Sequence, residues 1–207
     1  MGELARLAIK YGSDKHGHHY YCDNYERHLG KFKNEPITII ELGIGGYHYP
    51  DRGGAGLKMF ADFFPKARII GIDIHKKNSF NHNRIITFQG SQDDAALMND
   101  IVSQYGATII IDDASHMNKL TIASFQLLFP LLAPGGVYCV EDIESSWWEE
   151  HGFDGCRDLG NLSFPSTVNF FRNLITGVNQ KYNNAPNQYG IESIHFYENL
   201  IFIHKKP

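Results

Sequence analysis

The stretch ITIIELGIGGY, residues 37–47, decides the fold class. Its first half is a short run of β-branched and apolar residues, which predicts a buried strand over 37–42. The strand runs into a glycine-rich stretch, 43–56, and then into a helical pattern that stops at Pro65. Further apolar runs follow, separated by segments long enough for a helix: residues 68–73, 84–89, 108–113 and 137–142. This alternation predicts an α/β fold, Rossmann-like, with a central, mostly parallel sheet and helices on both faces.

The remaining segments complete the expected layout. Helical patterns occupy three of them: residues 95–106, 118–129 and 167–182. The only helix expected in the N-terminal 35 residues runs from Glu3 to Lys10. The closing segment IESIHFYENLIFIHKK, 191–206, has two alternating runs about Glu198-Asn199, which predicts a C-terminal antiparallel hairpin. No repeat or linker divides the chain, so we expect one domain over 1–207.

The composition excludes several classes of protein. With 19 Lys and Arg against 23 Asp and Glu, the net charge is −4, and no run of basic residues is longer than two, so nucleic acid is not an expected partner. No apolar run approaches the ~20 residues that span a bilayer, and the first residues lack a long apolar stretch, so we expect a cytoplasmic protein that does not bind membranes. Three scattered cysteines, Cys22, Cys139 and Cys156, are expected to be reduced.

The glycine-rich turn after the first strand is the expected ligand site, because such a turn lets a ligand approach the main chain at the strand ends. Gly43 and Gly45 fit the first two positions of the dinucleotide fingerprint G-x-G-x-x-G, but His48 stands at the third, which disfavours a nicotinamide dinucleotide. Glu41, at the end of the first strand, suits a cationic ligand better than a pyrophosphate. Asp73, at the end of the second strand, fits hydrogen bonding to ribose hydroxyls, with helix capping as the alternative role.

Two acidic pairs follow the fourth and fifth expected strands: Asp112-Asp113 in IIIDDASH and Glu141-Asp142 in YCVEDIE. Neighbouring parallel strands lie about 4.8 Å apart, so four carboxylates should gather at one edge of the sheet. Such a cluster is unfavourable unless it binds protons or a cation, and oxygen ligands of this kind favour Mg²⁺ over zinc. His116, which follows closely, can act as a general base near neutral pH. Capping of the next helix is the alternative role for a strand-end acid.

Several of these motifs together resemble a known family. ELGIGG resembles motif I of class I S-adenosylmethionine-dependent methyltransferases, GSQDD stands where these enzymes read the adenine ring, and LAPGG is similar to their turn before the fifth strand. DDASH, PGGVYCVEDIESSWW and the N-terminal YGSDKHGHHYYCDNYERHL make nearly the whole chain similar to a narrower group. That group is the Mg²⁺- and S-adenosylmethionine-dependent sugar O-methyltransferases of the macrocin and mycinamicin O-methyltransferase family.

The resemblance implies a class I methyltransferase fold, S-adenosylmethionine and Mg²⁺ as cofactors, and a role for each matching residue. It makes His116 the catalytic base and Asp113, Glu141 and Asp142 the metal ligands. The residues that it implies for cofactor binding are Tyr11, Lys15, Glu41, Gly43, Gly45, Asp73, Gln92, Asp93 and Asp112.

Two segments without regular periodicity are assigned to ligands. Residues 1–35 form the expected cofactor-covering segment, whose histidines either contact the cofactor or are purely structural. Residues 143–165 are aromatic, acidic and rich in glycine, and they form the expected substrate loop. Trp147 and Trp148 in this loop either stack on the apolar face of a sugar or anchor the loop by packing.

The expected reaction is SN2 methyl transfer from S-adenosylmethionine to a hydroxyl of a sugar or glycosylated metabolite in natural-product biosynthesis, with His116 as the base. One alternative is a catechol-type O-methyltransferase, whose D-A-x-K pattern differs from DDASH. Outside this class, the alternatives are a nicotinamide-dependent oxidoreductase and a noncatalytic nucleotide-binding protein. The edge of the terminal hairpin would allow a homo-oligomer.

Overall fold

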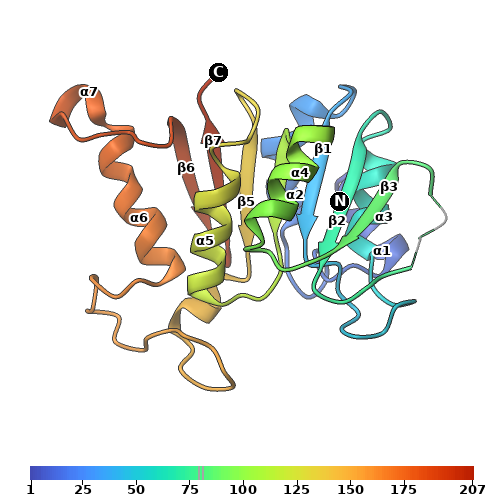
Figure 1. Ribbon diagram of the computed structural model, residues 1–207, viewed down its shortest axis with the longest axis horizontal. Helices are drawn as coiled ribbons and strands as arrows, with labels where there is room; N and C mark the ends of the chain where they lie inside the picture. Colours follow the sequence, from blue (N-terminus) through green and yellow to red (C-terminus); the bar gives the residue numbers. More distant parts are fainter. Residues whose placement is uncertain (79, 81) are drawn as a thin grey trace. The chain divides into compact units, whose positions relative to one another are not determined.

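Residues 1–78, 80 and 82–207 are described by the structure, a computed structural model, and they divide into two units, Met1–Ser91 and Gln92–Pro207 (Figure 1). Each unit has its own strands and helices, and each carries part of the predicted site. None of the helices formed by the described residues is long and apolar enough to cross a bilayer.

The first unit is built on three parallel strands in the order β3-β2-β1: β1 (Thr38–Leu42), β2 (Arg68–Asp73) and β3 (Ile85–Gln89). All five residues of β1 are buried, as is usual for a strand of a parallel sheet. α3 (Ala55–Phe63) begins two residues before the expected helical pattern and packs on β2 and on α1 (Glu3–Tyr11). The glycine-rich turn between β1 and α3 therefore lies at the carboxyl end of a buried strand.

The N-terminal segment contains a helix that the sequence pattern does not reveal. α2 (Cys22–Leu29) is followed by a single 3-10 turn, η1 (Gly30–Phe32), so the expectation of one helix in residues 1–35 is wrong. Most residues of α2 are polar, and its buried side is made by only a few side chains, among them Tyr25. Contacts with α1 stabilise α2, because packing rather than intrinsic propensity supplies most of the stability of a short helix.

The second unit contains four strands in the order β4-β5-β7-β6. Their bounds are β4 Ile109–Asp112, β5 Val137–Glu141, β6 Ile191–Tyr197 and β7 Leu200–Lys205. β4 and β5 are parallel, whereas β7 runs antiparallel to both β5 and β6. The five predicted parallel strands are present to within one residue at either end, so the predicted α/β class and the C-terminal hairpin are confirmed.

Helices α4 (Ala95–Tyr105), α5 (Asn118–Leu128) and α6 (Thr167–Val178) fall within predicted helical segments, and α6 packs on α5 and β6 (Figure 1). The predicted helix over 167–182 is interrupted at Asn179, so that α7 (Gln180–Asn183) forms a separate turn. A 3-10 helix, η2 (Ile143–Trp147), occupies the start of the predicted loop 143–165. Neither detail has a periodic signal in the sequence.

Two cationic side chains bind the carbonyl groups where a helix ends. Arg84, just before β3, donates to the carbonyl oxygens of Ala61 and Phe64 at the end of α3 and to that of Ala67 before β2, the shortest at 2.6 Å. Lys205, at the end of β7, donates to three carbonyl oxygens that follow α5, the shortest at 2.7 Å. These cations supply partners for carbonyl groups that a helix end leaves unsatisfied, and they interact favourably with the helix dipole.

Candidate active site

The glycine-rich turn after β1 folds back on itself. Gly43 and Gly45 have φ values of 85° and 73°, in the left-handed region that other residues rarely adopt. A Cβ on Gly46 would lie 2.4 Å from the main-chain carbonyl carbon of Arg52, so the two arms of the turn touch through their main chains. The predicted cofactor residues Gly43 and Gly45 therefore lie in a tight turn, in which a Cβ on Gly45 would meet no described atom within 4 Å.

Asp73, at the end of β2, holds this turn in place. Its Oδ2 accepts a hydrogen bond from the Ile44 N–H at 3.0 Å, and its Oδ1 accepts one from the His75 N–H at 2.8 Å. The carboxylate thus joins the ends of β1 and β2 instead of capping a helix. Its predicted contact with a ribose stays a prediction.

Glu41 is buried against a lysine from the N-terminal segment. The Nζ of Lys15 lies 3.4 Å from Glu41 Oε1, and the two side chains are only 2% and 3% exposed. A Cβ on Gly56 would lie 2.4 Å from the same Glu41 oxygen, so the lack of a side chain there lets α3 begin beside the carboxylate. Both members of the pair are predicted cofactor residues, and the structure places them in contact.

Tyr11, the last residue of α1, contacts α3. Its hydroxyl donates to Asp62 Oδ2 at 2.5 Å, and the Nζ of Lys10 donates to the same oxygen at 2.8 Å. The hydrogen bonds from Lys10 and Tyr11 lower the pKa of the Asp62 carboxyl. The predicted role of Tyr11 in cofactor binding stays a prediction.

Asp112, the last residue of β4, lies in a buried hydrogen-bond network. Its Oδ2 accepts from the Tyr138 hydroxyl at 3.0 Å, and its Oδ1 accepts from the side-chain amide of Gln92 at 3.2 Å. Gln92 also donates to the Ser124 hydroxyl at 2.9 Å. Burial raises the pKa of Asp112 to about 7, helped by the charge of Asp113 and opposed by the hydrogen bonds from Tyr138 and Gln92. A cation bound beside this carboxyl would favour its ionised form.

Asp113, His116 and Asp142 form a group at the ends of β4 and β5, in which one ligand atom from each lies within 4.8 Å of the others. His116 Nε2 is 4.0 Å from Asp113 Oδ1 and 3.9 Å from Asp142 Oδ2. All three side chains are partly exposed, between 20% and 27%. The structure thus brings together the predicted base and two of the three predicted metal ligands, at a place that a ligand can reach.

Two members of this group have an unusual main-chain conformation. His116 has φ 55° and Asp142 has φ 53°, in the left-handed region that is costly for residues with a Cβ. Such a conformation costs on the order of 1–3 kcal/mol and persists where the surrounding structure imposes it, often at a functional site. Both strained residues belong to the same small group of titratable side chains.

Two other predicted site residues lie elsewhere. Glu141 is buried in β5 opposite Leu200, and among the described residues it is not a member of the group of Asp113, His116 and Asp142. Asp93 is exposed. The predicted roles of Glu141 in metal binding and of Asp93 in cofactor binding stay predictions.

The predicted substrate loop supplies the cap of α5. Asp154 accepts hydrogen bonds from the first two N–H groups of α5, those of Asn118 at 2.7 Å and Lys119 at 3.0 Å. The buried side chain of Asn118 accepts from the Thr167 N–H at the start of α6, at 2.6 Å. A residue of the loop, and not a strand-end acid, therefore caps the helix that follows His116.

Trp147 and Trp148 are 37% and 40% exposed. The ring of Trp148 packs edge to face on Phe153, with ring centroids 5.0 Å apart. Its carbonyl accepts from the Gly155 N–H at 2.7 Å, which folds the loop back on itself. Trp148 thus anchors the loop and also offers surface, and the predicted contact of both tryptophans with a sugar stays a prediction.

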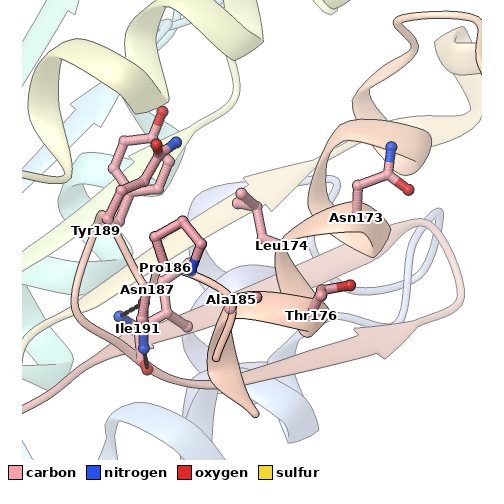
Figure 2. A pocket seen from close by; sticks show the side chains of 10 residues that line it. Asn173, Leu174, Thr176, Ala185, Pro186, Asn187, Tyr189 and Ile191 are labelled. Atoms are coloured by element: carbon pink, nitrogen blue, oxygen red, sulfur yellow. Dashed lines mark hydrogen bonds between the residues drawn. The ribbon is translucent and has the colours of Figure 1, made fainter. Parts of the chain in front are cut away.

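A surface hollow of about 250 Å³ lies between α6 and the segment that leads into β6 (Figure 2). The side chain of Asn187 joins this segment to the start of β6: it donates to the Ile191 carbonyl at 2.8 Å and accepts from the Ile191 N–H at 2.9 Å. Tyr189 is the only titratable residue among those that line the hollow. It contains none of the predicted site residues, and we assign it no chemistry.

The donor atoms of the Asp113–His116–Asp142 group fit a site for Mg²⁺ with a base beside it. Two carboxylates are the hard oxygen ligands that Mg²⁺ prefers, and Mg²⁺ commonly keeps further positions for water or substrate oxygens. An imidazole nitrogen is a less suitable ligand for Mg²⁺, but it accepts protons near neutral pH. His116 is therefore placed to deprotonate a molecule that is held at the two carboxylates.

Comparisons with known proteins give close relatives, although no family model matches the chain. The chain is 35% identical over 211 residues to the 8-demethyl-8-alpha-L-rhamnosyl tetracenomycin-C 2'-O-methyltransferase of Streptomyces olivaceus. It is also 35% identical over 212 residues to the mycinamicin VI 2''-O-methyltransferase of Micromonospora griseorubida, and 34% identical over 214 residues to the demethylmacrocin O-methyltransferase of Streptomyces fradiae. Each alignment covers 98% of the chain.

The comparison with solved structures also finds a methyltransferase. The chain matches the MycE methyltransferase of the mycinamycin biosynthetic pathway, in complex with Mg, SAH and mycinamycin VI, with a TM-score of 0.92 and 35% identity over 99% of its residues. This match confirms the class I methyltransferase fold. The chain spans about half the length of its relatives: 54%, 52% and 53% of the three curated proteins and 54% of the MycE chain.

Proposed function

The chain belongs to the macrocin and mycinamicin O-methyltransferase family, and from this premise we propose that it is a Mg²⁺-dependent O-methyltransferase that uses S-adenosylmethionine. The acceptor is a hydroxyl of a sugar or glycosylated metabolite, as the names of the relatives that methylate rhamnosyl tetracenomycin and mycinamicin suggest. The observation that carries the proposal is the group of Asp113, His116 and Asp142, which combines two hard oxygen ligands with a base in one accessible place.

His116 is the general base of the proposed reaction. The acceptor oxygen attacks the methyl carbon of S-adenosylmethionine, the bond between that carbon and sulfur breaks with its electron pair moving to sulfur, and His116 Nε2 takes the hydroxyl proton. Asp113 and Asp142 would hold Mg²⁺, with Glu141 as the third predicted ligand. Bound Mg²⁺ supplies Lewis acidity, which lowers the pKa of a coordinated hydroxyl. The two aspartates also orient the acceptor relative to His116.

The cofactor is assigned to the glycine-rich turn and to acids at the ends of the strands. Strand-end acids, rather than lysines or arginines, suit the cationic sulfonium and ammonium of S-adenosylmethionine, and Asp112 is the candidate for the ammonium. The other residues assigned to the cofactor are Tyr11, Lys15, Glu41, Gly43, Gly45, Asp73, Gln92 and Asp93. Trp147 and Trp148 in the loop 143–165 are assigned to the acceptor.

The test is binding of S-adenosylmethionine, S-adenosylhomocysteine and NADH, each with and without Mg²⁺, measured by thermal shift and calorimetry. We expect the two sulfur nucleotides to bind, the native state to gain stability that rises with the logarithm of the ligand concentration above its Kd, and Mg²⁺ to add to this gain. Binding of NADH alone would support an oxidoreductase instead. Methylation of a catechol, but of no glycoside, would support the catechol-type alternative, and nucleotide binding without methyl transfer to any acceptor would support a noncatalytic role.

The wider properties of the protein are also proposals. We propose that residues 1–207 act as one domain, that residues 1–35 cover the cofactor and that the protein is cytoplasmic, with no nucleic-acid or membrane partner. We also propose that Cys22, Cys139 and Cys156 stay reduced; none of the three forms a disulfide within the described residues. Association of chains into a homo-oligomer, through the edge of the terminal hairpin, is tested by light scattering.

A further inference from the structure

Asn199 lies in the two-residue turn between β6 and β7, and it bonds to the chain on both sides of Ile143. Its side-chain N–H donates to Asp142 Oδ1 at 3.3 Å, and its side-chain oxygen accepts from the Glu144 N–H at 2.8 Å. Asn199 thus contacts the Asp142 carboxylate directly and also fixes the main chain two residues later, at Glu144. We propose that Asn199 is a positioning residue that orients the Asp142 carboxylate for Mg²⁺, an inference that rests on the proposed function.

The register of the hairpin produces this contact. Glu141 pairs with Leu200 in the antiparallel ladder of β5 and β7. The residue after Glu141, Asp142, therefore faces the residue before Leu200, Asn199. Leu200, Ile201, Phe202 and Ile203 are all fully buried, so both faces of β7 pack in the core and a shift of register would disrupt this packing. The core therefore fixes Asn199 opposite Asp142.

The two oxygens of the Asp142 carboxylate have different neighbours. Oδ1 accepts from Asn199, whereas Oδ2 lies 3.9 Å from His116 Nε2, on the side of the Asp113–His116–Asp142 group. The bond between the Glu144 N–H and Asn199 also helps to hold Asp142 at its costly φ of 53°. A hydrogen-bond partner behind a metal ligand typically orients the ligand, and its loss costs about 10–100-fold in metal affinity.

The conformation of Asn199 makes a clean variant possible. Its φ is 58°, in the left-handed region that glycine adopts readily, so Asn199→Gly removes the amide and keeps the turn. The matched control is Asn184→Gly: Asn184 has φ 57°, is exposed, and its side chain makes no hydrogen bond within the described part of the chain. Asn199→Ala removes the same amide but keeps a Cβ in this conformation, so comparing it with Asn199→Gly separates the loss of the amide from the relaxation of the turn.

The experiment is calorimetric titration with MgCl₂ in the presence of S-adenosylhomocysteine, together with Tm and affinity for S-adenosylhomocysteine alone. For Asn199→Gly we expect the Kd for Mg²⁺ to rise about 10-fold or more, with cofactor affinity unchanged and Tm close to that of Asn184→Gly. If the variant also methylates, its turnover should return toward the wild-type value at saturating Mg²⁺.

The outcomes separate this inference from the proposed function. If the wild-type chain binds S-adenosylhomocysteine but shows no Mg²⁺ binding, the proposed metal site is wrong, and the role of Asn199 is wrong with it. If the wild-type chain binds Mg²⁺ and Asn199→Gly binds it equally tightly, only the role of Asn199 is overturned. Equal losses of Mg²⁺ and cofactor affinity in Asn199→Gly would show a general structural role, and would also overturn it.

Discussion

At the scale of single residues, the proposed chemistry depends first on His116. His116→Ala removes the base, and we expect turnover to fall by about 10²-fold or more, the usual contribution of a general base, while the Kd for S-adenosylhomocysteine stays the same. Steady-state kinetics and calorimetry measure the two quantities. His204→Ala is the control, since His204 lies in β7, outside the segments assigned to the cofactor, the metal and the acceptor. Undiminished turnover of His116→Ala would refute the role of His116.

The buried hydroxyl of Tyr138 is needed by Asp112. Tyr138→Phe leaves Asp112 Oδ2 without this donor in a buried place, and we expect a loss of about 1–3 kcal/mol in the free energy of unfolding. Denaturant unfolding at pH 8 measures it. Tyr182→Phe, at a side chain that is 83% exposed, should change the unfolding free energy little. Equal stability of the two variants would mean that water or a rearranged Gln92 replaces the hydroxyl.

Individual site residues differ in how well the sequence predicts them. Asp113 and His116 lie in one short motif at the end of a strand, so their placement follows from local pattern alone. The contact between Asn199 and Asp142 does not follow from a local pattern, because the register of the hairpin brings these two residues together. Lys15 likewise meets Glu41 through the packing of the N-terminal segment, which no periodicity in the sequence specifies.

At the scale of elements, Asp154 ties the predicted substrate loop to the start of α5. Asp154→Ala removes the cap from two N–H groups, and we expect a loss of about 0.5–2 kcal/mol in the free energy of unfolding and faster proteolysis of the loop. Denaturant unfolding and limited trypsin digestion measure these effects. Asp94→Ala is the control, because Asp94 also caps a helix but lies outside the loop: it accepts from the Leu97 N–H of α4 at 3.1 Å. A loop equally resistant in both variants would show that Asp154 does not fix it.

The contact between α1 and α3 depends on pH through Asp62. Its lowered pKa means that the ionised carboxylate stabilises the native state above the unfolded-state value of 3.8, and that this contribution disappears as the pH falls through the folded-state pKa. We therefore expect Asp62→Asn to lower Tm modestly at pH 7, by an amount that shrinks below about pH 4. Circular dichroism melts at several pH values give the difference. The same difference at pH 7 and at low pH would contradict the assignment.

Helices and strands were predictable from the sequence where burial makes their residues mainly apolar. The five parallel strands are mainly apolar, so each is visible in the sequence to within one residue at either end. α2 is mostly polar and depends on its contacts with α1. The interruption at Asn179 lies close to the point where the returning chain meets the end of α6. A Cβ on Gly177 would lie 2.6 Å from the Pro186 carbonyl oxygen, a contact between segments that sequence periodicity does not encode.

At the scale of the whole molecule, the proposed activity needs a metal. We expect EDTA to abolish methyl transfer to the acceptor and added Mg²⁺ to restore it, because the acceptor hydroxyl is a poor nucleophile without a Lewis acid. A radiolabelled methyl transfer assay measures both steps, with calcium as a comparison ion. Full activity in metal-free buffer would remove the magnesium assignment, whereas failure of Mg²⁺ to restore activity would point to damage by the chelator.

The strained main chain at His116 and Asp142 has a consequence for engineering. Glycine adopts φ values of 55° and 53° without the penalty that a Cβ brings, so His116→Gly and Asp142→Gly would relieve strain while deleting the proposed base and a proposed ligand. A library selected for heat tolerance alone would therefore drift toward glycine at both positions and lose its reaction. Selection for stability in this protein should therefore keep these two positions constant and test the proposed methyl transfer in every round.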